Sequence, residues 1–106
     1  MFKITDELTF KREVKFLVPV DGGHETHSLD FTFRVLEIDE DELLIEGGIR
    51  AVLKKVIVKI DGMLDDDDRP IPYSDKMRDR LLGKRFIELA ALKAYSEACS
   101  KVVEGN

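Results

Sequence analysis

The sequence has few of the residues that stabilise or equip small domains through covalent or metal chemistry. Among its 106 residues it has one cysteine, Cys99, and two histidines. A single cysteine excludes an intramolecular disulfide and is typical of a reducing compartment. Because Cys99 lies in a predicted helix, we expect a small buried thiol and not a reactive one.

Long apolar runs and clusters of basic residues are also absent. No apolar run reaches the ~18 residues of a membrane span, and the N-terminal MFKITDELTF lacks the basic start and apolar middle of a signal peptide. The formal net charge is −5, and the 17 basic residues are scattered among 22 acids, whereas nucleic-acid binding needs clustered Lys and Arg. We therefore expect a cytoplasmic protein that binds neither membrane nor nucleic acid.

The length fits one domain over residues 1–106. A domain of this size removes roughly 60 to 70% of its unfolded surface from water, which is enough to fold without metals or disulfides. Hydrophobic residues make up 43% of the chain and charged residues 37%, so a core and a solvated surface are both available. We expect a β-hairpin region at 1–37 and a helical region at 38–106.

Apolar and polar residues alternate on either side of an Asp-Gly-Gly turn in the stretch from Phe10 to Leu36. A period of two is expected of half-buried strands, so the stretch predicts a β-hairpin. Arg12 interrupts the apolar side, and we expect its stem to cover apolar surface while its guanidinium reaches water. The predicted inward residues are Val14, Phe16, Val18 and Val20 before the turn, and Leu29, Phe31, Phe33 and Val35 after it.

The register of this hairpin depends on where its turn is centred. A two-residue turn at Gly22-Gly23 places Phe16 opposite Leu29, and a four-residue turn places Phe16 opposite Phe31. Both registers give apolar cross-strand pairs and one favourable charge pair, so both stay open.

A third register centres the turn on Asp21-Gly22, a dipeptide that hairpins prefer. It places Glu13 opposite Asp30, and like charges directly opposite each other destabilise a sheet. We therefore rank this register last.

Two helices are predicted between residues 38 and 60. The segment Ile38 to Glu46 has a start resembling a capping box and acids in its first turn, which favours a short helix. Gly47-Gly48 ends it, and apolar residues at helical spacing predict a second helix from Ile49 to Ile60. β-Branched residues leave a strand at Val56 to Ile60 as the alternative, but the spacing of the lysines favours the helix.

The C-terminal half is predicted to hold a loop and two further helices. Asp61 to Pro72 contains glycine, four consecutive aspartates and two prolines, and reads as a loop. Ser74 is a suitable N-cap for a helix that Gly83 ends or kinks, and a long helix follows from Lys84 to about Val103. The predicted fold is α+β: an N-terminal antiparallel β-hairpin (small sheet) packed on a C-terminal set of three to four α-helices.

No group of residues indicates a catalytic or metal site. His24 and His27 fall in or beside the turn without the third and fourth ligands of a zinc site. The run Asp65 to Asp68 lacks the alternating ligands, central glycine and terminal glutamate of a calcium-binding EF-hand loop, so an exposed, mutually repelling loop is favoured. We assign no catalytic, cofactor-binding or metal-binding residue and expect no enzyme.

The surfaces of the hairpin are the remaining candidates for function. A two-stranded hairpin is marginal alone, so its apolar face must pack on the predicted helices. Its outer edges could accept a strand from a partner or a second copy. Edges blunted by lysine, glutamate and Pro19 are an equally good interpretation.

The order of these features resembles that of phage tail assembly chaperones, the small proteins encoded just before the tape-measure protein of long-tailed phages and prophages. The likeness covers nearly the whole chain, and only the order and spacing of its motifs carry weight. The matching features are Thr9-Phe10, Val18-Pro19, Gly22-Gly23, Leu29 to Val35, Asp41-Glu42-Leu43-Leu44, Asp61-Gly62, Pro72-Tyr73-Ser74, Leu81-Leu82 and Ala91 to Lys101 with Ala94-Tyr95.

The resemblance implies a non-enzymatic role in the cytoplasm of the bacterial host. Such a chaperone binds the tape-measure protein, keeps its apolar helices in solution, helps to recruit tail-tube subunits and is absent from the mature virion. A homo-oligomer is left open. The alternatives are an acidic inhibitor or DNA mimic, which the net charge and the Asp run motivate, and a structural tail or connector subunit.

Overall fold

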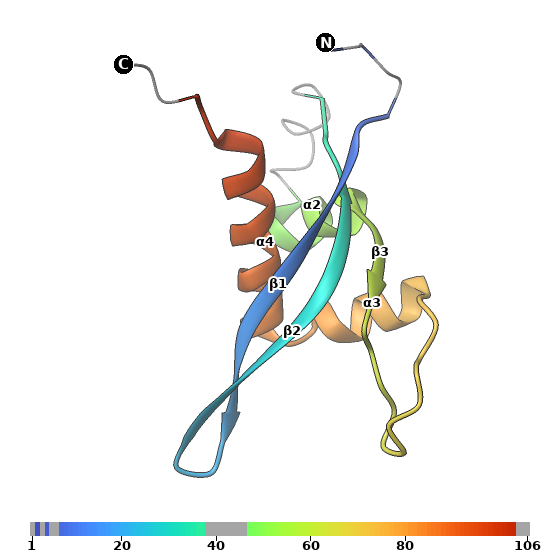
Figure 1. Cartoon of the computed structure of the whole chain (residues 1–106), viewed down its shortest axis with the longest axis vertical. Coiled ribbons are helices and arrows are strands. Elements are labelled where there is room, and N and C mark those ends of the chain that lie inside the picture. The colour runs from blue at the N-terminus through green and yellow to red at the C-terminus, as the bar shows by residue number, and fades with distance from the viewer. Residues whose placement is uncertain (1, 3, 5–6, 38–46, 104–106) are drawn as a thin grey trace.

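The computed structural model describes residues 2, 4, 7–37 and 47–103, which form an antiparallel sheet with helices on one face (Figure 1). The strand order in the sheet is β1-β2-β3. The α+β class is confirmed. The elements within the described ranges are β1 (Thr9–Val20), β2 (Gly23–Arg34), α2 (Gly48–Val56), β3 (Ile57–Asp61), α3 (Asp75–Leu82) and α4 (Arg85–Ser100).

The third strand corrects the predicted division into a hairpin region and a helical region. Helix α2 ends at Val56, and the backbone becomes extended at Ile57, with φ −81° and ψ 117°. The alternative of a strand in this stretch is therefore the right one from Ile57 onward. Strand β3 pairs with β2 and places Ile60 beside Phe31, so one helix lies between two strands of the same sheet.

Apolar periodicity could not separate these two outcomes. Val56, Ile57 and Ile60 are all buried, and their spacing suits either an amphipathic helix or a helix that changes into a strand. Pairing with β2 satisfies the backbone groups of β-branched residues, which favour extended structure. The short helix predicted at Ile38 to Glu46 lies outside the described residues.

The hairpin turn is centred on Asp21-Gly22, the register that the sequence analysis ranks last. Val20 pairs with Gly23, and Glu13 lies opposite Asp30. Gly22 has a φ of 80°, which a type II turn requires at its third position and which glycine adopts without strain. This local backbone preference outweighs the like-charge pair.

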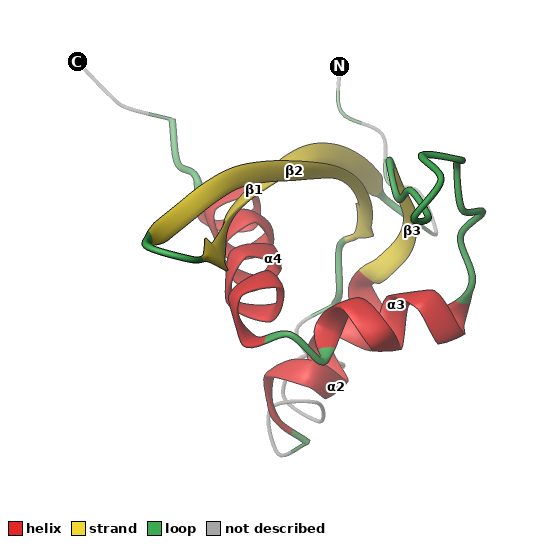
Figure 2. Cartoon of the chain, turned by 90° about the horizontal axis from the view of Figure 1, so that it is seen from below, coloured by secondary structure: helices red, strands yellow, loops and turns green. Residues whose placement is uncertain are grey.

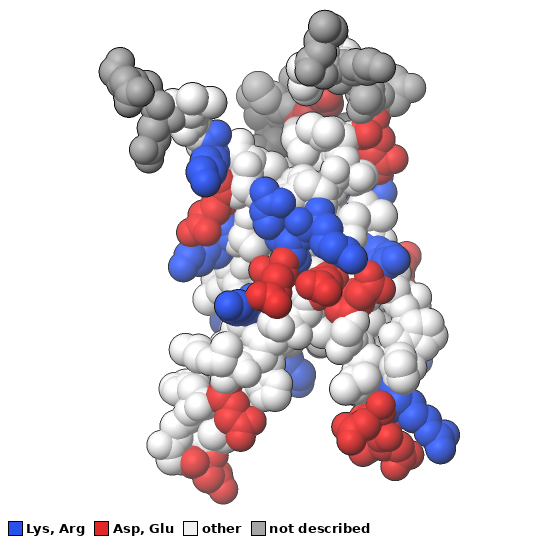
Figure 3. Space-filling model, viewed as in Figure 1, with Lys and Arg blue, Asp and Glu red and all other residues white. Residues whose placement is uncertain are grey.

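The like-charge pair is tolerated because it lies on the solvent-facing side of the sheet, beside cations. The Nζ of Lys15 is 3.7 Å from a carboxylate oxygen of Glu13, and the Nζ of Lys59 is 3.4 Å from one of Asp61, which pairs with Asp30. Figure 3 views this outer face and shows basic and acidic side chains side by side across it. Water and these cations reduce the repulsion to a small term.

The inner face of the sheet carries the core, and the twisted hairpin arches over α3 and α4 (Figure 2). The Phe33 ring is 5.6 Å from that of Phe31 and 5.5 Å from that of Tyr95, measured between centroids. The Tyr95 hydroxyl accepts a hydrogen bond from the Leu36 N–H at 3.1 Å, which fixes α4 against the end of β2. The buried apolar residues are Val14, Leu29, Phe31, Phe33, Val52, Leu53, Val56, Ile57, Ile60, Met63, Leu82, Ile87 and Ala91.

The predicted signals mark both ends of α3 and the start of α4, whereas α4 ends at Ser100, before the predicted end near Val103. The Ser74 Oγ accepts a hydrogen bond from the Met77 N–H at 3.2 Å, so Ser74 is the N-cap of α3 as predicted. Gly83 separates α3 from α4. Helix α4 packs against β1 and also against α2 and α3.

A buried carboxylate, absent from the sequence-based expectations, joins α2 to α4. The side chain of Glu88 is 5% exposed. One of its oxygens lies 3.2 Å from the Nε of Arg50, and the other lies 3.4 Å from a guanidinium nitrogen of Arg85. Arg50 also donates to the Leu82 carbonyl at 3.3 Å, so one guanidinium connects both ends of the α3–α4 corner to α2.

Phe31→Asp should unfold the domain, because the Phe31 side chain is fully buried between the sheet and the helices. Burying an unpaired carboxylate costs more than the ~3–5 kcal/mol of removing a core phenylalanine. Circular dichroism and urea denaturation measure the effect. Lys15→Glu is the control, because Lys15 is 70% exposed. A cooperatively folded Phe31→Asp variant would show that the two faces are assigned wrongly.

Arg50→Met should lower the free energy of unfolding by about 1–3 kcal/mol, because Glu88 then loses a hydrogen-bonded cation in a buried position. The matched control is Lys54→Met on the same helix. Lys54 lies 3.8 Å from a carboxylate oxygen of half-exposed Asp79, a surface pair worth up to about 1 kcal/mol. Equal losses in urea denaturation would contradict the structural role of Arg50.

Candidate functional site

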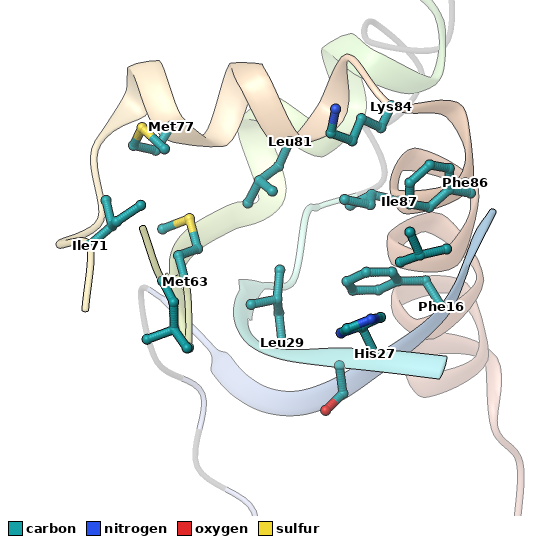
Figure 4. Close-up of a pocket in the computed structure, with 14 residues that line it drawn as sticks. Phe16, His27, Leu29, Met63, Ile71, Met77, Leu81, Lys84, Phe86 and Ile87 are labelled. Atoms are coloured by element: carbon teal, nitrogen blue, oxygen red, sulfur yellow. The ribbon is translucent and has the colours of Figure 1, made fainter. Parts of the chain in front are cut away.

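An apolar groove with a volume of about 420 Å³ lies between the distal half of the hairpin and the segment that follows β3 (Figure 4). Helix α3 and the first turn of α4 close its inner end. Cavities of this size, between about 300 and 1,000 Å³, are typical of ligand sites. The residues that line it are Phe16, Val18, His27, Ser28, Leu29, Gly62, Met63, Leu64, Ile71, Met77, Leu81, Lys84, Phe86 and Ile87.

The groove exists because β3 stops pairing before the hairpin ends. Gly62 follows the last residue of β3 and has a φ of 102°, a backbone conformation that residues other than glycine rarely adopt. The chain there turns away from β2. A Cβ at Gly62 would lie 3.4 Å from the Leu29 Cδ2, so the two walls diverge from a point of close contact.

The hairpin forms the first wall, here called the hairpin arm and comprising residues 15–28. Its inward side chains continue the apolar face of the sheet past the core. The Phe16 and Phe86 rings lie 6.1 Å apart between centroids, so the arm rests on the start of α4. His27 lies opposite Phe16 on the neighbouring strand.

Residues 62–71 form the second wall, here called the acidic arm. Leu64 forms a β-bridge with Pro70, and the Ile71 N–H donates to the Met63 carbonyl at 2.8 Å. These bonds align Met63 and Ile71 on the side that faces the groove, as Figure 4 shows. Leu64 is 56% exposed.

Asp65 organises the tip of the acidic arm into a defined turn. Its Oδ1 accepts hydrogen bonds from the N–H groups of Asp67 at 2.8 Å and Arg69 at 3.0 Å. Its carbonyl accepts from the Asp68 N–H at 3.0 Å. The run Asp65 to Asp68 is exposed, as predicted, but backbone hydrogen bonds order it.

The chemistry of the groove suits binding. The residues that line it are apolar apart from His27, Ser28 and Lys84. The His27 Nε2 lies 3.2 Å from a carboxylate oxygen of Glu25, and this contact is exposed to solvent. Met63 of the acidic arm and Met77 of α3 both line the groove (Figure 4), and methionine adapts its shape to varied apolar partners.

The ends of both arms are acidic. Figure 3 shows red side chains at both ends, with a basic side chain beside those of the acidic arm. Asp21 and Glu25 belong to the hairpin end, and Asp65 to Asp68 with Arg69 form the other. Carboxylates therefore border an apolar groove on two sides.

The residues weighed in the sequence as metal ligands do not come together. His24 and His27 both lie in β2, opposite Pro19 and Phe16. Within residues 2, 4, 7–37 and 47–103, no three His, Cys, Asp or Glu side chains are grouped to hold a metal ion.

Cys99 lies in α4 and is exposed, so the expectation of a buried thiol is wrong. The helix ends at Ser100, and its last turn extends past the core, because the buried residues of α4 lie in its first half at Ile87, Glu88 and Ala91.

Comparisons with models of known protein families, with curated proteins and with solved structures find no match. None of the helices in the described ranges has the length and apolar character needed to cross a membrane.

Gly62→Ala should lower the free energy of unfolding by about 1–3 kcal/mol, because alanine strains a backbone with positive φ. The matched control is Gly23→Ala. Gly23 begins β2 without a positive φ, and nothing lies within 4 Å of its added Cβ. Thermal denaturation distinguishes the two variants, and an unchanged Gly62→Ala midpoint would mean that this turn does not set the groove wall.

Proposed function

We propose that this chain is a phage tail assembly chaperone, which binds the tape-measure protein and helps to recruit tail-tube subunits during long-tail assembly. The observation that carries the proposal is the apolar groove between the two arms. The order of sequence motifs supplies the identity of the partners. The role is non-enzymatic, and it is exercised in the host cytoplasm before the chaperone leaves the finished tail.

The groove suits a client whose apolar surface must be covered temporarily. Its lining presents aromatic, leucine, isoleucine and methionine side chains, and Leu64 stands half-exposed at its mouth. An isolated groove of this size buries one short segment of a long client. A tape-measure protein with repeated apolar segments would therefore bind several copies of this chain, or one copy would hold one segment at a time.

The distribution of charge gives little support to the DNA-mimic alternative. A mimic needs carboxylates at phosphate-like spacing along one face. On the outer face of the sheet, Lys15 and Lys59 lie within 4 Å of Glu13 and Asp61. The ends of the two arms carry exposed acids over a short span, and they border the apolar groove.

Co-expression with the long helical protein encoded beside this chain tests the proposal. We expect a complex that purifies as one species and a larger soluble fraction of the client. Leu64→Gln should reduce the recovery of the complex, because Leu64 lines the groove. Leu89→Gln is the matched control, because Leu89 is also about half-exposed but lies outside the groove lining.

Two results would contradict the proposal. One is a client whose solubility and elution do not change on co-expression. The other is detection of this chain in stoichiometric amount by mass spectrometry of purified virions, which would identify a structural tail or connector subunit.

A further inference from the structure

The groove has a strip of unpaired backbone along one side. Strand β2 has 12 residues, and β1 pairs along its whole length. On the other side, β3 pairs only with the four residues from Asp30 to Phe33. In the part of the chain that the structure describes, the first half of β2 therefore has an open edge on the side of the acidic arm.

The hairpin turn determines which residues of β2 present that open edge. A two-residue turn makes Val20 and Gly23 the hydrogen-bonded pair that closes the hairpin, and such pairs recur at every second residue. The odd-numbered residues of β2 therefore bond to β1. The N–H and C=O groups of Thr26 and Ser28 point to the open edge, and Ser28 lines the groove.

The apolar side chains lie where an added strand would use them. Phe16, His27 and Leu29 point to the inner face of the sheet and line the groove. In a strand paired with β2, alternate side chains would point to the same face. These side chains would enter the space between the hairpin arm and Met63.

The charge at the two arm ends selects the partner. Asp21 and Glu25 lie at one end, and Asp66 and Asp67 at the other, and all four are exposed. Lys84 lies at the inner end, away from the arm tips, and Arg69 neighbours the acids of one tip. A partner with basic residues flanking its apolar ones is therefore favoured over an acidic one.

We propose that an extended peptide with alternating apolar residues and basic ends adds to β2 at Thr26 and Ser28, in line with β3, and places its apolar side chains in the groove. The strand-addition proposal extends the proposed function by naming the binding mode and the chemistry of the bound segment. It rests on the proposed function only for the identity of the natural partner. The outer edge of β1 lacks this combination, because the groove lies on the other side of β2. An amphipathic helix lying in the groove would leave the Thr26 and Ser28 amides unpaired.

Amide hydrogen exchange measured by NMR tests the binding mode directly. The probe is a short synthetic peptide in which valine and leucine alternate with threonine between lysine ends. On addition of the peptide, exchange at Thr26 and Ser28 should slow by tenfold or more, while Glu25 and His27, already bonded to β1, should change little. Binding without protection of Thr26 and Ser28 would overturn strand addition and would point to a helix in the groove. No shift of any groove residue at millimolar peptide would overturn the site.

Two further measurements separate backbone pairing from charge. Thr26→Pro removes an outward N–H without removing a hairpin hydrogen bond, and should weaken peptide binding about fivefold to tenfold. Thr26→Val, which keeps the N–H, should bind the peptide as the natural chain does.

A probe with glutamate ends should bind several-fold more weakly than the lysine-ended probe, and the difference should shrink at high salt. Equal binding by both probes would remove the charge argument.

The exchange experiment on the natural chain needs no variant, so it decides the question even where Thr26→Pro fails to fold. Because the probe is synthetic, it is also independent of the natural partner. Protection of Thr26 and Ser28 together with no tape-measure complex would remove the proposed function and keep the strand-addition site. A tape-measure complex without that protection would remove the strand-addition site and keep the proposed function.

Discussion

The pairing of β3 with the second half of β2 is the contact on which the rest of the structure depends. It buries Ile57 and Ile60 against the inner face and makes β2 a central strand between Asp30 and Phe33. It also ends after four pairs, because Gly62 turns the chain away from the sheet. The same short pairing therefore completes the core and leaves the hairpin arm open along one edge.

The two faces of the sheet differ in their exposure to solvent, and therefore in the side chains that they tolerate. The inner face must exclude water, and Phe31 and Phe33 are fully buried there. The outer face only has to stay solvated, so it tolerates Glu13 opposite Asp30 with lysines nearby. A like-charge pair costs tenths of a kcal/mol to about 1 kcal/mol at such a position, which is less than a strained turn would cost.

Local features of the chain were predictable, and features that depend on distant partners were not. The alternation around the turn predicted both hairpin strands, Ser74 predicted the N-cap of α3, and Gly83 predicted the break before α4. Each signal acts within a few residues. The end of α2 at Val56 depends instead on the pairing of the next residues with Asp30 to Phe33 of β2, which lie more than 20 residues away in the sequence.

The register failed for a related reason. A comparison of cross-strand charges treats every pair as equally buried, whereas the positive φ of Gly22 acts whatever the exposure of the pair. The position of Cys99 failed because helical periodicity gives the face of a helix and not how far the helix extends past the core. Both predictions were wrong because the solvent exposure of the side chains could not be read from the sequence.

The groove could not be predicted from periodicity, because its residues come from loops and helix ends as much as from strands. Met63, Leu64 and Ile71 follow no repeat in the sequence. The one available signal was the presence of large apolar residues on both sides of an Asp run. Large apolar residues are not expected in a fully exposed loop, so their presence indicates that the loop also lines a groove.

The geometry also limits how tightly the groove can bind. The open edge offers the backbone groups of few residues, and the hydrogen bond of each is worth about 0.5–1.5 kcal/mol net of the water it displaces. Apolar side chains must supply the rest, and ordering an extended peptide costs part of that gain. Binding of this kind is modest for one segment and becomes stronger when several linked segments of one partner are engaged at the same time.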